Sequence, residues 1–85
     1  MDYTYILICS DGTLYTGWTN DITKRLEAHN SGKGAKYTKT RTPVTLGYLE
    51  EHTEKSAAMS REYQIKHMTR NQKLELINTY LKKEG

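Results

Sequence analysis

The pattern of apolar and polar positions along the chain predicts three strands. Residues 3–9 are almost all aromatic, β-branched or aliphatic, which is typical of a strand buried in a sheet. Residues 13–18 follow a short polar turn and predict a second strand. Residues 44–51 follow Pro43 and predict the third.

The turn between the first two strands decides which side chains share a face of the sheet. A three-residue loop, residues 10–12, places Gly12 in the left-handed position that such hairpins commonly use. It pairs Leu7 with Tyr15, so Tyr5 and Tyr15 become diagonal neighbours on one face. A two-residue loop would place the two phenols on opposite faces. We favour the three-residue loop.

A helix over residues 21–30, with Asn20 as its N-cap, is predicted to follow the hairpin. Ile22, Leu26 and His29 lie at i, i+4 and i+7 and so share one face of this helix. Arg25 lies four residues before His29, so we expect both to share one edge of the inward face.

Two further helices complete the predicted fold. One covers residues 54–68 and is capped by Thr53 or Ser56, and the other covers residues 70–83 and is capped by Thr69. The last helix is expected to turn inward Leu74, Ile77 and Leu81. The order β-β-α-β-α-α predicts a single α+β domain over residues 1–85, with a small three-stranded antiparallel sheet flanked by helices.

Glu62 stands among apolar positions of the second of these helices. At ~100° per residue it falls between Ala58 and Met59 on the inward face, which also holds Ile65 and Met68. Burying a carboxylate is costly unless it is paired or binds a metal. The alternative is a carboxylate at the edge of the face, which reaches solvent or pairs with Lys66 at i+4.

Composition limits the class of protein. The chain has 85 residues, enough for one domain with a small core, and its seven tyrosines and one tryptophan can build that core. The single cysteine, Cys9, excludes an intramolecular disulfide and a zinc site with several cysteines. The sequence shows no apolar run of the ~18 residues that a membrane helix needs and no signal peptide, so we expect a cytoplasmic protein without a membrane partner.

The charge is concentrated in one segment. The chain carries a net charge of +3, and residues 31–42 alone carry +4 with no acidic residue. A local cationic patch suits contact with phosphate groups, although a solvated lysine-rich loop has the same composition. The side chains expected to contact nucleic acid are Lys33, Lys36, Tyr37, Lys39 and Arg41.

Several of these segments match one known pattern. Tyr3-Thr4-Tyr5 and Tyr15-Thr16-Gly17 stand in order on the hairpin, Arg25 and His29 follow, and residues 61–66 surround Glu62. In this set the chain resembles the GIY-YIG nuclease superfamily, in its small stand-alone, single-domain bacterial branch of UPF0213-like proteins. Tyr3 and Thr4 replace the glycine and isoleucine of the first motif. Trp18 stands where many members have lysine.

The resemblance implies a metal-dependent nuclease that hydrolyses DNA phosphodiester bonds in repair, recombination or uptake, with structure selectivity as one option. The residues it assigns to catalysis are Tyr5, Tyr15, Arg25, His29 and Glu62. Glu62 is expected to hold Mg²⁺ or Mn²⁺, because a hard cation that keeps several waters needs few carboxylates. Whether Tyr5 or Tyr15 accepts the proton of the attacking water, directly or through His29, stays open. We expect DNA as the partner of a monomer. The alternatives are a catalytically weak or inactive nucleic-acid-binding module on the same fold and a small protein-interaction domain.

Overall fold

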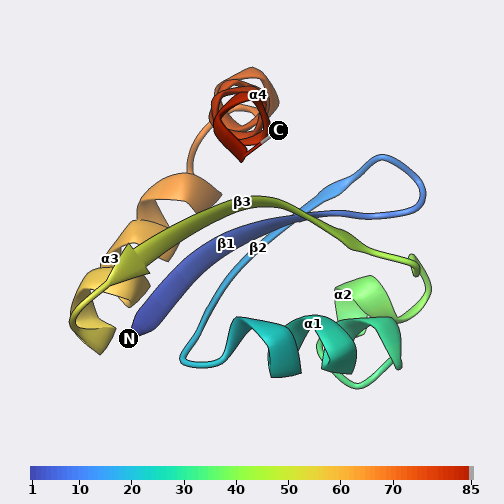
Figure 1. Cartoon of the computed structure of the whole chain (residues 1–85). Helices are drawn as coiled ribbons and strands as arrows, with labels where there is room; N and C mark the ends of the chain where they lie inside the picture. The colour runs from blue at the N-terminus through green and yellow to red at the C-terminus, as the bar shows by residue number, and fades with distance from the viewer. Residues whose placement is uncertain (85) are drawn as a thin grey trace.

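The computed structural model describes residues 1–84. An antiparallel sheet lies at its centre, with strands in the order β2-β1-β3, and helices flank it (Figure 1). The elements in chain order are β1 (Asp2–Ile8), β2 (Leu14–Thr19), α1 (Ile22–Asn30), α2 (Lys36–Lys39), β3 (Thr45–His52), α3 (Lys55–Lys66) and α4 (Arg70–Glu84). The α+β fold and its three-stranded antiparallel sheet are confirmed, and the short α2 inside the basic segment is an addition to the predicted order.

The β1–β2 hairpin has the predicted register. The amide of Cys9 donates to the carbonyl of Thr13 at 2.9 Å, and Gly12 adopts a φ of +83° in the three-residue loop. Leu7 pairs with Tyr15 and Tyr5 pairs with Gly17. The loop chemistry therefore places both phenols on one face of the sheet, as expected.

The sheet separates two small cores. Tyr5, Leu7, Cys9 and Val44 form the first core together with side chains of α1. Ile6 points to the other face, where it packs with Ile65 of α3 and Ile77 of α4. Helices α1 and α2 thus cover one face and α3 and α4 the other (Figure 1). None of the helices in residues 1–84 is both long and apolar enough to span a membrane.

Two of the predicted helix starts are wrong by about one residue. Asp21, not Asn20, is the N-cap of α1, and its carboxylate accepts from the amide of Lys24 at 3.0 Å. The Thr19 hydroxyl accepts from the amide of Asp21 at 3.1 Å, which holds the chain in a turn until Asp21. Helix α3 begins after Glu54 without a side-chain cap, rather than after Thr53 or Ser56.

The start of α4 is confirmed. The Thr69 hydroxyl accepts from the amide of Gln72 at 3.2 Å, and the Gln72 side chain accepts in return from the amide of Thr69 at 2.9 Å. This reciprocal pair satisfies two backbone donors that the helix itself leaves without acceptors.

Two side chains predicted to face inward are exposed. Met59 and Leu81 are each 45% exposed. Ala58 and Ile65 are fully buried instead, so the stripe of α3 that faces the sheet runs along these two residues and leaves Met59 on the flank. Leu81 lies one turn beyond the buried Ile77, at a place in α4 where the ring of the preceding residue, Tyr80, packs on that of Tyr48 instead.

Candidate functional site

Tyr5 lies at the centre of the site. Its side chain is only 1% exposed, and its phenol crosses over Gly17 of the neighbouring strand β2. A Cβ on residue 17 would lie 2.5 Å from the Tyr5 oxygen, so only glycine leaves room for the phenol there. Since β2 is an edge strand, the Tyr5 hydroxyl is carried towards an open edge of the sheet.

His29 holds this hydroxyl in place. His29 stands in the last turn of α1, and its imidazole is completely buried. The imidazole Nε2 lies 3.0 Å from the Tyr5 oxygen. Its Nδ1 lies 2.8 Å from the Thr38 hydroxyl, which itself donates to the carbonyl of Ala35 at 3.2 Å. A hydroxyl has one proton, so Nδ1–H must donate to Thr38 and Nε2 must accept from Tyr5. The hydrogen bonds thus define a neutral imidazole and a protonated phenol.

The electrostatics of this pair agree with that assignment. Burial raises the pKa of Tyr5 well above its usual value of 10.0, and the charges of Tyr15 and Glu62 raise it further, while Arg25 opposes them. Burial and then the Arg25 guanidinium lower the pKa of His29 from 6.5. Tyr15, Arg25 and Glu62 therefore all act on the buried Tyr5–His29 pair.

Tyr15 is the phenol that solvent can reach. Its side chain is partly exposed on the same face as Tyr5, with its ring centroid 5.2 Å from that of His29 in an edge-to-face contact. It also stacks on Tyr37 of α2 at 6.0 Å. Between them, β1 and β2 supply one enclosed and one accessible phenol beside the same imidazole.

Arg25 was expected to share an edge of the inward face of α1 with His29, but it is exposed whereas His29 is completely buried, and it lies next to the basic segment. It lines a hollow of about 380 Å³ together with Lys24 and Lys33. The same hollow is lined by Thr19 at the end of β2 and by Asn20 and Asp21, which lead into α1. Three cations from two segments thus gather where Arg25 meets the loop, an arrangement suited to an anion.

Glu62 reaches the site from the other layer of the fold. It lies on the stripe of α3 between the buried Ala58 and Ile65, and α3 packs against both β1 and β2. Its side chain is 23% exposed and pairs with Lys66 at 3.6 Å. The structure therefore shows the second alternative, a carboxylate at the edge of the inward face that reaches solvent and pairs with Lys66 at i+4.

The donor set around Glu62 fits a hard divalent cation held mainly by water. The described residues 1–84 contain no group of three or more His, Cys, Asp or Glu side chains that could enclose a metal. A single carboxylate that is partly exposed is sufficient for Mg²⁺ or Mn²⁺, which retain most of their waters. Such an ion has to compete with Lys66 for the carboxylate.

The predicted nucleic-acid contacts divide into two groups. Lys33, Lys36 and Lys39 extend into solvent from the basic segment. Arg41 instead pairs with Asp11 at 3.0 Å, donates to the Tyr37 carbonyl at 2.8 Å and lies 4.1 Å from the centre of the Tyr37 ring. Arg41 thus fastens α2 to the hairpin, and the Tyr37 ring is already stacked by Arg41 and Tyr15.

The sequence analysis missed Thr38 and Gly34. Thr38 fixes the tautomer of His29, and a Cβ on Gly34 would lie 2.5 Å from two ring atoms of His29. The basic segment therefore also encloses His29. Gly34 beside the predicted basic loop was the one available signal, since a glycine often marks a close approach of the backbone.

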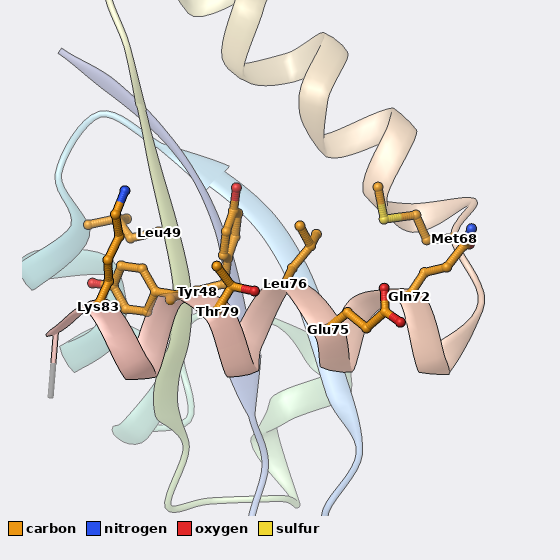
Figure 2. A pocket seen from close by; sticks show the side chains of 9 residues that line it. Tyr48, Leu49, Met68, Gln72, Glu75, Leu76, Thr79 and Lys83 are labelled. Carbon is orange, nitrogen blue, oxygen red and sulfur yellow. The ribbon is translucent and has the colours of Figure 1, made fainter.

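A separate cavity of about 560 Å³ lies between β3 and α4 (Figure 2). Its lining is largely apolar and aromatic, and includes Tyr48, Leu49, Met68 and Leu76. None of the predicted catalytic residues borders it, so it is distinct from the candidate site.

Comparison with known proteins identifies the family of the chain. Residues 1–75 match the model of the GIY-YIG catalytic domain. A UPF0213 protein of Clostridium perfringens is 58% identical over 84 residues, which is 99% of this chain and 90% of that protein. The solution NMR structure of a UPF0213 protein from Bacillus halodurans is 45% identical, with a TM-score of 0.59 over 93% of this chain and 85% of that one. A solution NMR structure from E. faecalis is 40% identical, with a TM-score of 0.60 over 92% and 83% of the two chains. The chain therefore belongs to the GIY-YIG catalytic domain family, a family of nuclease domains, and to its UPF0213 branch.

Proposed function

We propose that this protein is a metal-dependent nuclease that hydrolyses phosphodiester bonds of DNA. The observation that carries the proposal is the convergence of Tyr15, Arg25 and Glu62 on the buried Tyr5–His29 pair. Four separate elements supply these groups. Together they include a cation for the phosphate, a carboxylate for a metal and a phenol that water can reach, which are the parts that phosphodiester hydrolysis requires.

Arg25 is the residue that holds the reacting phosphate. Its guanidinium offers a planar fork of donors to two oxygens, and its charge stabilises the negative charge that builds up in the transition state. Lys24 and Lys33 line the same hollow and attract the phosphate to it. Lysine at position 25 would keep the charge but lose the fork.

The two phenols have different roles. Tyr15 is the base, because it is the phenol that solvent reaches: it first gives up its own proton to bulk water and, as the phenolate, takes the proton of the attacking water. Tyr5 is enclosed, keeps its proton and donates it to Nε2 of His29. Tyr5, His29 and Thr38 thus form a rigid wall that fixes where Tyr15 and the phosphate lie.

Glu62 is the residue that holds the divalent cation. A bound Mg²⁺ or Mn²⁺ supplies Lewis-acid stabilisation of charge on the phosphate and its leaving oxygen. Lys66 pairs with the same carboxylate at 3.6 Å, so the cation has to displace Lys66 from it.

The test is cleavage of single-stranded and duplex DNA by the purified protein with Mg²⁺ or Mn²⁺. We expect cleavage that EDTA stops, and a loss of at least 100-fold in Glu62→Gln and in Arg25→Gln, since removing one group that stabilises transition-state charge costs about that much. Glu75→Gln is the matched control, because Glu75 borders the other cavity, between β3 and α4. Equal cleavage by all variants would show a contaminating nuclease, and DNA binding without cleavage would identify a binding module instead.

A further inference from the structure

A groove follows the outer edge of β2, beyond the residues that the sequence predicted to contact DNA. It consists of two hollows of about 230 and 240 Å³ that share Leu14, Tyr37 and Lys73 and are therefore continuous. Tyr15 and Thr16 border one end, at the candidate site. We call this feature the β2-edge groove.

The groove is cationic along one wall. Lys66 comes from α3, and Arg70 and Lys73 come from the first turn of α4. No acidic side chain is among the residues that line either hollow. The opposite wall is Tyr37, which belongs to the basic segment, residues 31–42, that carries +4. Both sides of the groove therefore favour a polyanion.

The cationic wall is held in a fixed position relative to the hairpin. Nη2 of Arg70 donates to the carbonyl of Gly12 at 3.1 Å, which connects the start of α4 to the hairpin turn. Lys73 lies one turn further along the same helix, is partly buried and borders both hollows. The charges are thus set along the groove by a helix and a turn rather than by a loose loop.

An unpartnered polar atom lies in the same groove wall. Thr16 is 5% exposed, and among the described residues its Oγ1 is the buried side-chain atom without a hydrogen-bond partner. A buried hydroxyl of this kind costs stability unless a ligand or water bonds to it. Its place beside Tyr15 and Lys66 puts this unused hydrogen-bonding group where the groove meets the candidate site.

We propose that the β2-edge groove binds the phosphodiester backbone of the DNA strand that continues from the reacting phosphate. The inference rests on the proposed function, because it takes Tyr15 as the end of the groove where the reaction occurs. Lys66 links the two, since it pairs with Glu62 and also borders the groove. The strand leads from Glu62 past Lys66 to Lys73 and Arg70.

The test measures binding of a fluorescein-labelled 20-base-pair DNA by fluorescence anisotropy, in EDTA so that no cleavage occurs. Each phosphate contact contributes about 0.9 to the slope of log K against log [salt], so losing one contact at 0.1 M salt lowers affinity about eightfold. We expect that loss, and a slope reduced by about 0.9, in Lys73→Gln. Lys73→Arg keeps the charge and is expected to retain both affinity and slope.

Lys82→Gln is the matched control, because it removes the same charge from the far end of α4. We expect it to change affinity less than twofold. Equal affinity and slope in Lys73→Gln, Lys82→Gln and the unmodified protein would overturn the proposal. So would a loss in Lys73→Arg as large as in Lys73→Gln, because the charge would then not be the cause.

The two proposals fail separately. If the protein cleaves DNA in a Glu62-dependent manner and Lys73→Gln binds normally, the groove proposal alone is wrong. If no cleavage occurs but Lys73→Gln lowers affinity and slope, the groove is a DNA-binding surface and the nuclease proposal is wrong.

Discussion

Replacing Gly17 by alanine tests the enclosed phenol most sharply. The added Cβ would lie 2.5 Å from the Tyr5 oxygen and 2.7 Å from Cζ, whereas carbon atoms in contact are normally ~3.5–4.0 Å apart. The phenol would have to move by about 1 Å. The surrounding atoms leave no space for this movement, because Tyr5 is 1% exposed and its hydroxyl is hydrogen-bonded to His29. Thr38 holds the His29 imidazole on its other side.

Overpacking of this kind typically costs about 1–3 kcal/mol, and a domain of this size loses ~4–8 °C in Tm for each kcal/mol. For a loss of about 2 kcal/mol in the free energy of unfolding, we expect Gly17→Ala to lower the Tm measured by circular dichroism by about 8–16 °C. We also expect it to abolish DNA cleavage at temperatures where it remains folded, because the displaced Tyr5 no longer positions His29 and Tyr15.

Gly47→Ala is the matched control for overpacking. Its Cβ would lie 2.9 Å from Cγ1 and 3.0 Å from Cδ1 of Ile8, a smaller overlap than at Gly17, on the face of the sheet away from Tyr5 and His29. We expect it to lower Tm less and to leave cleavage within about twofold when compared as folded protein. A Gly17→Ala variant within about 0.5 kcal/mol of the unmodified protein would refute the placement of Tyr5.

Three further predictions concern the neighbourhood of this phenol. Thr38→Val removes the acceptor of the His29 Nδ1–H, so we expect the free energy of unfolding, measured with urea, to fall by about 1–3 kcal/mol. We also expect slower DNA cleavage. An unchanged free energy of unfolding would contradict the assigned tautomer. Because the pKa of His29 is lowered from 6.5 in the folded state, the unfolded chain binds its proton first as pH falls. The urea concentration at the unfolding midpoint should therefore be lower at pH 5 than at pH 7.5, and this dependence on pH should be weaker in His29→Gln. An equal dependence on pH in both proteins would assign the effect to other groups. Thr16→Val removes a buried hydroxyl without a partner, so calorimetry should show a free energy of unfolding that is higher by about 1 kcal/mol. The same variant should bind DNA more weakly in EDTA, and an unchanged affinity would show that Oγ1 does not bond to the strand.

The hairpin shows what local sequence can determine. The position of Gly12 fixed the loop length, and the loop length fixed the faces of Tyr5 and Tyr15, so the pairing of strands 1 and 2 was predictable residue by residue. The same holds for the start of α4, where Thr69 and Gln72 lie three residues apart and cap each other.

The surroundings of His29 could not be predicted in this way. Thr38 is nine residues away and reaches the imidazole only because α2 folds back over α1. Helix α2 has four residues, too few for a periodic pattern to appear. The basic composition of this segment indicated contact with phosphate groups or, alternatively, a solvated loop, but not its role in enclosing His29.

One contact of Glu62 could be predicted from nearby residues, and another depends on how the helices pack on the sheet. The spacing to Lys66 predicted an ion pair because both residues lie on one helix. Its approach to Tyr5 depends on how α3 crosses β1 and β2, which helical periodicity does not define. The β2-edge groove depends in the same way on the crossing of α3 and α4, so Lys73 gave no signal in the sequence.

The convergence of Glu62 with the phenols is tested most directly by titrating the protein with Mn²⁺ and recording the aromatic NMR signals. A cation on Glu62 should broaden the signals of Tyr5, Tyr15 and His29 at lower Mn²⁺ concentration than that of Tyr80, which lines the separate cavity between β3 and α4. Glu62→Gln should remove this broadening. Selective broadening of Tyr80, or unchanged broadening at Tyr5 and Tyr15 in Glu62→Gln, would contradict the site described for this protein.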